Sequence, residues 1–142
     1  MATFTTTATQ TVANGQNVLF TEPISCSKNC SVVHRNGSGI YTLRGSNNCN
    51  QAQYNVEFTG NIAIATGGTV EPISVAIALS GEPLYGATAT VTPAAIGDFF
   101  NVTAQTTITV PCGCCENIAV ENVSATTAID VANATIRITR VC

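Results

Sequence analysis

The chain contains no tryptophan, only one histidine and few charged residues. Lys, Arg, Asp and Glu make up 9% of the 142 residues, against about 25% in an average soluble protein. With five basic residues and a net charge of −3, the chain has too little positive charge to displace many counterions from a phosphate backbone, which argues against a nucleic-acid partner. Its surface must consist largely of Thr, Ser, Asn, Gln and small apolar residues. That composition suits an all-β protein whose faces are partly covered by copies of itself.

Targeting signals are also missing. No apolar run reaches the ~18 residues that a membrane span requires, and residues 1–16 lack the basic and apolar regions of a secretory signal. We therefore expect synthesis in the cytosol and no membrane insertion. The seven cysteines contrast with this expectation, because cytosolic chains seldom keep disulfides. A particle that assembles inside a cell and is released by lysis, such as a virion or a spore, reconciles the two.

The residues expected of an active site are scattered. His34 stands alone between Val33 and Arg35, and no glycine-rich phosphate loop joins a strand to a helix. The carboxylates do not cluster along the chain; they are Glu22, Glu57, Glu71, Glu82, Asp98, Glu116, Glu121 and Asp130. Because catalysis needs titratable groups that converge in a cleft, we predict a protein that is not an enzyme and that uses no cofactor.

The most informative stretch is residues 51–84. Tyr54, Val56 and Phe58 lie on even positions between polar residues, so one face of this strand is buried and the other is wet or touches a partner. Gly67-Gly68 breaks the pattern, and a second strand then alternates Val75 and Ile77 with Ser and Ala. The small, uncharged face of this second strand is the first indication of an oligomer.

The remaining chain alternates in the same way between Gly, Pro and Asn turns. Ile136 and Ile138 mark the inward face of the last strand. The predicted strands are 5–11, 17–21, 32–35, 40–43, 52–64, 73–80, 84–91, 99–110, 116–124, 127–131 and 134–141. Roughly ten short strands without an amphipathic helix predict a β-sandwich or barrel. We interpret residues 1–142 as one domain, with residues 1–10 a candidate for an extended N-terminal arm.

A Tyr-x-Val-x-Phe strand, a Gly-rich break, an Ile/Val/Leu strand ending in Ser-Gly and then Glu-Pro-Leu-Tyr-Gly resemble the jelly roll of the tumour necrosis factor (TNF) and complement globular-head superfamily. The bacterial type is the most similar, as in the collagen-like glycoprotein of Bacillus spores and small Cys-bearing proteins of clostridial prophages. The resemblance covers about residues 7–141, although no collagen-like tract is present. It implies a two-sheet, TNF-like jelly roll that forms a homotrimer. The Ser/Ala face of residues 73–80, with Thr135, Arg137 and Thr139, is consistent with the trimer contact.

The cysteines are Cys26, Cys30, Cys49, Cys112, Cys114, Cys115 and Cys142. In the implied jelly roll the first six lie in loops at one end of the sandwich, and Cys142 and the N-terminus lie at the other. Disulfides worth about 2–4 kcal/mol each, a zinc site, buried free thiols and redox chemistry at the vicinal pair all remain open; we commit to no metal. The odd, terminal Cys142 is a candidate for a bond between chains.

These observations predict a non-enzymatic, homotrimeric surface protein that decorates a phage virion or forms a fibre head there, with an adhesive role toward host glycans. A spore-surface or appendage subunit crosslinked by disulfides is one alternative. A glycan-binding receptor module is another, weakened by the absence of Trp and by only three Tyr.

Overall fold

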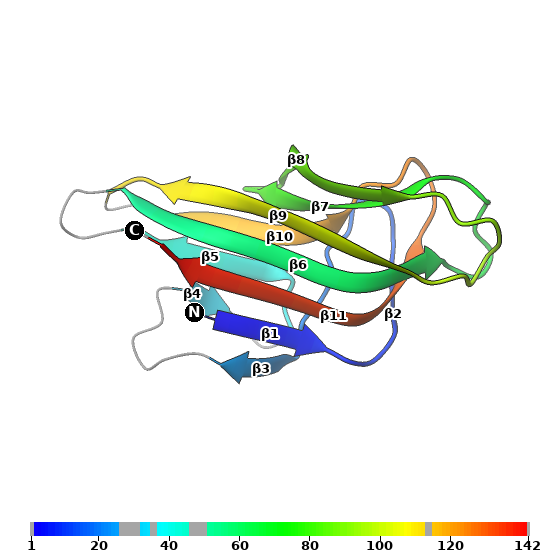
Figure 1. Ribbon diagram of the computed structural model, residues 1–142, viewed down its shortest axis with the longest axis horizontal. Helices are drawn as coiled ribbons and strands as arrows, with labels where there is room; N and C mark the ends of the chain where they lie inside the picture. The colour runs from blue at the N-terminus through cyan, green and yellow to red at the C-terminus, as the bar shows by residue number, and fades with distance from the viewer. Residues whose placement is uncertain (1, 26–31, 35–36, 46–50, 113–114, 142) are drawn as a thin grey trace.

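The described part of the chain is all-β. A computed structural model describes residues 2–25, 32–34, 37–45, 51–112 and 115–141, and these residues form eleven strands. They include no helix, and so none that could span a membrane. All strand pairs are antiparallel, and they form two sheets that face each other (Figure 1).

The first sheet, called the front sheet after its position in Figure 1, has six strands. Five of them have the order β3 (Glu22–Ser25), β1 (Ala2–Thr6), β11 (Ile129–Arg140), β6 (Ala52–Ile64) and β9 (Phe100–Val110). The sixth, β2 (Gln10–Val12), pairs with the first residues of β11, whereas β1 pairs with later residues of the same strand. The back sheet has the order β4 (Val32–His34), β5 (Ile40–Arg44), β10 (Cys115–Asn122), β7 (Ile73–Leu79) and β8 (Glu82–Val91). Apart from the consecutive pairs β4-β5 and β7-β8, neighbouring strands are far apart in sequence because the chain crosses repeatedly between the sheets. This is the connectivity of a jelly roll.

The alternation seen in the sequence builds the core. On β6, β7 and β11 every second side chain points between the sheets. The seven predicted core residues all have no exposed surface; they are Tyr54, Val56, Phe58, Val75, Ile77, Ile136 and Ile138. They belong to one continuous cluster that both sheets share.

Aromatic rings fill the core near β1, β4 and β5. The Tyr41 ring lies 5.0 Å from Phe4 and 5.9 Å from Phe20, and Phe20 meets Phe58 edge-on at 6.3 Å. Such tilted and edge-to-face pairs each add roughly 0.5–1.5 kcal/mol beyond burial of their area. The cluster therefore joins strands of both sheets.

Two segments differ from the sequence-based expectation. Residues 2–6 form β1, whose Ala2 and Phe4 are buried, so they are a strand of the front sheet instead of an arm. The predicted strands 127–131 and 134–141 are one strand, β11, with a register shift between Ala132 and Thr135. Asn133 lies at the shift with φ of 52°, a left-handed conformation that Asn tolerates better than most residues. The strand therefore continues through a register shift, at the position where the sequence pattern predicted a break between two strands.

Candidate functional site

The outer face of the front sheet is mainly polar and largely uncharged. Thr5, Thr135, Thr59 and Thr103 stand opposite one another on four neighbouring strands, β1, β11, β6 and β9. The hydroxyls of Thr5 and Thr135 are 3.2 Å apart, within hydrogen-bond distance. Cross-strand threonine pairs of this kind stabilise a sheet by about 0.2–1 kcal/mol each. The row presents hydroxyl and methyl groups across the sheet without any charge.

The neighbouring row carries two opposite charges. Arg137 on β11 and Glu57 on β6 are direct cross-strand partners, with Thr3 and Gln105 on either side. Opposite charges at facing positions favour this strand pairing and leave the row with no net charge. Together with Asn55 and Thr107, the side chains of Glu57 and Gln105 line a shallow hollow of about 200 Å³.

Hydrogen bonds hold the amide side chains of this face in place. Thr107 Oγ1 donates to Asn55 Oδ1 at 2.9 Å, and Asn101 Nδ2 donates to Asn61 Oδ1 at 3.1 Å. Both bonds join β6 to β9. Polar groups that are already oriented lose less side-chain entropy when another surface covers them. The face is thus prepared to contact a second neutral, polar surface.

Strand β9 is an edge strand of the front sheet and borders the outer face described above. Its eleven residues pair with β6 without a register shift, from Ala52↔Val110 to Ile62↔Phe100. The sequence FNVTAQTTITV contains no charged residue and no proline. Edge strands are usually protected by such residues or by bulges, because their unpaired backbone groups can bind another chain. β9 has none of these protections.

The Ser/Ala face of β7, predicted as a trimer contact, is placed differently. Ala76 and Ala78 are 0% and 1% exposed within the single chain, so they offer almost no surface to a partner. The back sheet contains β7, whereas Thr135, Arg137 and Thr139 lie on the front sheet. These two sets of residues therefore do not form one continuous face. The sequence pattern identified the alternation but not the sheet to which each strand belongs.

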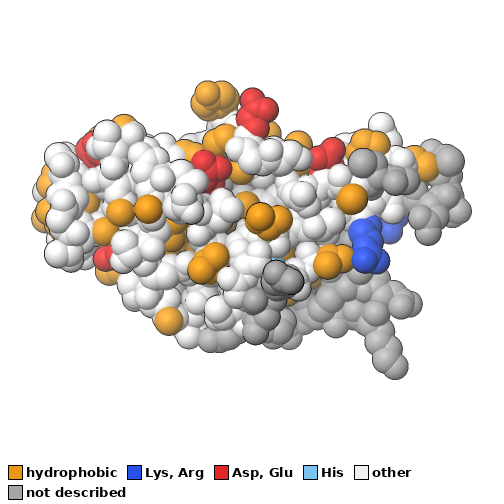
Figure 2. Space-filling view, turned by 180° about the vertical axis from the view of Figure 1, so that it is seen from behind, with side chains coloured by type: hydrophobic (Ala, Val, Ile, Leu, Met, Phe, Trp, Pro, Cys, Tyr) orange, Lys and Arg blue, Asp and Glu red, His pale blue; other side chains and the backbone are white. Residues whose placement is uncertain are grey.

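The outer face of the back sheet differs in character from that of the front sheet. Figure 2, which views the molecule from behind, shows hydrophobic side chains as small separate spots instead of one broad patch. Acidic side chains are spread along this face, and the basic ones gather at one end. The part of this face visible in Figure 2 is therefore mixed, with separate apolar spots and charges of both signs.

The ends of the strands also place the segments that carry cysteine. Cys26, Cys30, Cys49, Cys114 and Cys142 lie outside the described residues; Cys112 is half-buried and Cys115 exposed. The described residues that border these segments meet at one end of the sandwich. Their contacts are Thr3↔Ser25, Val32↔Leu43, Arg44↔Cys115 and Ala52↔Val110. The predicted convergence of three cysteine-bearing segments therefore agrees with the described strand ends.

Cys142 lies outside the described residues, but the last residues described at each end of the chain do not lie opposite the cysteine-bearing segments as expected. The Val141 N–H donates to Gln53 O at 2.8 Å, and Ala2 pairs with Ile138. Residues 2 and 141 therefore lie at the same end as the three other segments, where Figure 1 also draws N and C. The error follows from β11, because counting it as two strands reversed the direction of the last one.

His34 has a packing role. Its ring stacks on Tyr41 with centroids 4.3 Å apart and an angle of 12°, and it lies 4.7 Å from Phe4. His34 Nε2 is 2.9 Å from the carbonyl oxygen of Ser38. These contacts hold the histidine against the aromatic cluster. No nucleophilic side chain is among the ring's contacts within the described residues.

The carboxylates bind separate hydroxyl groups. Asp130 accepts from Thr11 at 2.7 Å, Glu116 from Ser80 at 3.0 Å and Glu71 from Thr126 at 3.0 Å. Burial raises the pKa of the Glu121 carboxyl. In the described ranges, no three His, Cys, Asp or Glu side chains come close enough to hold a metal ion. The arrangement stabilises turns and strand pairs.

The fold defines a class: the chain is an all-β, two-sheet jelly roll of the TNF type. It is similar to the globular domain of zebrafish complement 1qA protein, with a TM-score of 0.64, 10% identity, and coverage of 99% of this chain and 96% of that one. It is also similar to Eiger TNF from S. frugiperda, with a TM-score of 0.67, 10% identity, and coverage of 99% and 91%. At this identity the likeness concerns the fold alone. No protein-family model and no curated protein sequence matches the chain.

Proposed function

We propose that this protein is a non-enzymatic, homotrimeric structural subunit on the outside of a phage virion, as capsid decoration or as part of a fibre head. The observation that carries the proposal is the outer face of the front sheet. It is broad and mainly polar, and hydrogen bonds hold two pairs of its side chains. It is bordered by the edge strand β9, which has no charged residue, proline or register shift.

A ring of three chains explains both features together. In a closed ring each subunit contributes two different patches, one to each neighbour. The outer face of the front sheet supplies one patch, and the side of the sandwich at β9 supplies the other. The contact would lack the strong hydrophobic character of many obligate interfaces and would depend on shape and hydrogen bonds. The resemblance of the sequence to bacterial trimeric jelly rolls supports the same stoichiometry.

The proposed location on a virion is supported by the composition of the chain and by the resemblance of its sequence to small clostridial prophage proteins. A low-charge β-sandwich with few exposed cleavage sites resists proteases outside the cell, and assembly before lysis reconciles seven cysteines with synthesis in the cytosol. Particles from an induced lysogen that encodes the chain provide the test. We expect peptides of this protein in density-purified virions and antibody labelling on their outside. Its absence from particles that contain all other structural proteins would contradict the virion assignment.

The exposed Cys115 at the end where the cysteine-bearing segments meet favours one other candidate, a spore-surface or appendage subunit crosslinked through disulfides. The two candidates differ on a non-reducing gel of the native particle. Ladders that collapse with reductant indicate crosslinked appendages, whereas a single band at the monomer mass indicates a trimer held by non-covalent contacts.

A further inference from the structure

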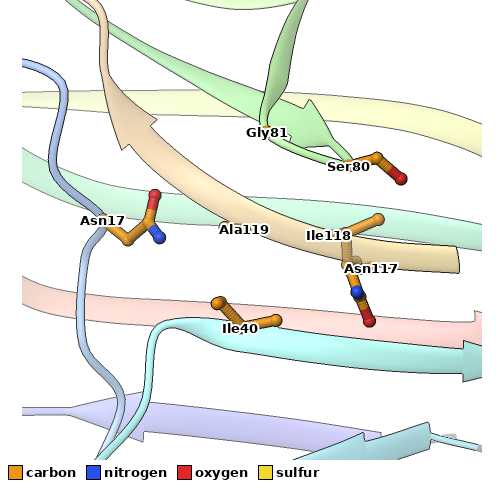
Figure 3. A pocket seen from close by; sticks show the side chains of 7 residues that line it. All are labelled: Asn17, Ile40, Ser80, Gly81, Asn117, Ile118 and Ala119. Carbon is orange, nitrogen blue, oxygen red and sulfur yellow. The ribbon is translucent and has the colours of Figure 1, made fainter.

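A hollow on the outer face of the back sheet goes beyond the structural role proposed above. It has a volume of about 250 Å³ and is bordered by Asn17, Ile40, Ser80, Gly81, Asn117 and Ala119 (Figure 3). The segment before β3 contributes Asn17, β5 contributes Ile40, and the turn between β7 and β8 contributes Ser80 and Gly81. Strand β10 runs along the floor. We propose that this hollow binds one ring of a neutral sugar.

Small side chains on the floor create the hollow. Ala119 on β10 pairs with Ala78 on β7 on one side and with Ile40 on the other. Both alanines are almost completely buried although they point outward from the sheet. The larger residues around them form the walls. A longer side chain at position 119 would fill the space.

One wall is held by an unusually close contact. A Cβ atom on Gly39 would lie 2.7 Å from Asn17 Cβ and 2.9 Å from Val18 O, so only glycine lets these segments approach. Asn17 itself forms an isolated bridge with Glu121 of β10. The backbone of Asn17 is therefore fixed relative to the floor, and its amide points toward β10 in Figure 3.

The opposite wall is a strained turn. Ser80 has φ of 52°, a left-handed conformation that is unfavourable for a residue with a side chain. The turn is maintained because Ser80 N–H donates to Asn117 O at 2.7 Å and Ser80 Oγ donates to Glu116 at 3.0 Å. Strained residues concentrate at binding sites, where the surrounding structure holds them in place.

The available polar groups are neutral. Thr42 Oγ1 donates to Asn117 Oδ1 at 2.8 Å, which orients this amide. Within the described residues, neither the Asn117 Nδ2 group nor the Asn17 amide has a hydrogen-bond partner. Amide groups match the hydroxyls of a sugar, since each amide offers both a donor and an acceptor. None of the described residues that line the hollow is charged, so we expect no preference for anionic sugars.

The size and the apolar wall fit a single ring. Ile40 is 49% exposed and presents aliphatic surface beside Ala119, to which the C–H face of a sugar can pack. The volume lies below the roughly 300–1,000 Å³ of pockets for drug-sized ligands. The hollow also faces away from the front sheet, so a trimer that buries the front sheet leaves it open.

The test is an NMR titration of the ¹⁵N-labelled protein with methyl glycosides of glucose, galactose, mannose and N-acetylglucosamine, and with sialic acid as the anionic comparison. We expect saturable shifts of the Asn17, Gly81 and Asn117 amide signals with at least one neutral glycoside. Asn17→Ala and Asn117→Ala should each weaken binding about tenfold, the effect of one neutral hydrogen bond. Asn101→Ala, on β9 of the front sheet and so on the opposite side of the sandwich, should leave the affinity unchanged. Gly39→Ala should also weaken binding, because the added methyl group displaces Asn17.

Absence of shifts with all four glycosides, or shifts located elsewhere, would overturn the proposal. Binding of sialic acid alone would overturn it as well. If Asn117→Ala disturbs the fold, Asn17→Ala still tests the sugar site, because the Asn17 side-chain amide makes no hydrogen bond to the rest of the described chain. Unchanged affinity in that variant refutes the site.

Discussion

Two tyrosines of the core differ in the surroundings of their hydroxyl groups. Tyr54 OH donates to the carbonyl oxygen of Arg44, whereas Tyr41 OH is buried and finds no hydrogen-bond partner in the part of the chain that the structure describes. Burial raises the pKa of Tyr41, so this group stays neutral. A buried hydroxyl without a partner costs about 1–3 kcal/mol.

The pair provides opposite predictions for the same chemical change. Tyr41→Phe should raise the free energy of unfolding by about 1 kcal/mol, because it removes an unsatisfied group. Tyr54→Phe should lower it by about 1 kcal/mol, because the Arg44 carbonyl loses its donor. Urea unfolding followed by fluorescence or circular dichroism measures both. Destabilisation by Tyr41→Phe would mean that its hydroxyl has a partner.

Phe58 tests the assignment of strand faces. The side chain has no exposed surface and meets Phe20 edge-on. Phe58→Ala should therefore destabilise the protein by roughly 3–5 kcal/mol, the range for an aromatic side chain removed from a core. Thr103→Ala, on the outer face of β9, is a control that should change stability by less than about 1 kcal/mol. Equal effects of the two changes would contradict the inward orientation of Phe58.

At the scale of the strands, the alternation of large and polar residues predicted the buried face of each strand, but the sequence did not predict the direction in which the last strand runs. The pattern at Tyr54, Val56 and Phe58 predicted both the strand and its buried face, because large residues every second position can be buried only on one side of a sheet. The end of the molecule at which a strand finishes depends on every earlier turn. Treating residues 127–131 and 134–141 as two strands reversed the expected direction of the second, whereas both belong to β11.

The candidate site was predictable only in part, for a related reason. The polar positions of β6 indicated a wet or partner-bound face, but the row of Thr5, Thr135, Thr59 and Thr103 depends on cross-strand register. These strands are not joined by short turns that would set their register, so the alternation within each strand fixes its faces but not which residues stand opposite one another. The hollow beside Asn17 is similar, since it combines residues from four separate segments. Only the folded chain brings them together.

The strand ends lead to a prediction about the cysteines. Cys26, Cys30 and Cys49 form one group and Cys112, Cys114 and Cys115 a second. Of the first group, the segment with Cys49 is flanked by Arg44 and Ala52, which pair with Cys115 and Val110, and the segment with Cys26 and Cys30 joins β3 to β4 at the same end of the sandwich. Since a disulfide needs Cα atoms within about 7 Å, we expect at least one bond between these two groups in protein purified from particles. Peptide mapping without reduction identifies the pairs. Complete alkylation of all thiols in the native, metal-free protein would exclude them.

At the scale of the whole molecule, the trimer can be tested through the front sheet. Light scattering should give a mass of about three times 14.6 kDa, also with Cys142→Ser in reductant. Thr59→Arg places a long charged side chain in the middle of the neutral threonine row and should shift the protein to monomers, since an unpaired charge in an interface is costly. Thr42→Arg on the back sheet is the matched control and should remain trimeric. A wild-type monomer would refute the trimer.

The neighbouring positions of Ala2 on β1 and Ile138 on β11 have a consequence for engineering. Adjacent strands are about 4.8 Å apart, so a short linker can join residue 141 to residue 2 and make the backbone circular. New ends can then be opened between Asn14 and Gly15, in an exposed turn where Gly15 has φ of 78°. In the natural order a peptide fused to either terminus extends from the end of the sandwich where residues 2 and 141 lie. In the permuted chain the fused peptide would extend from the end where Asn14 and Gly15 lie. The permutation would turn the same jelly roll into a display scaffold that presents cargo from either pole.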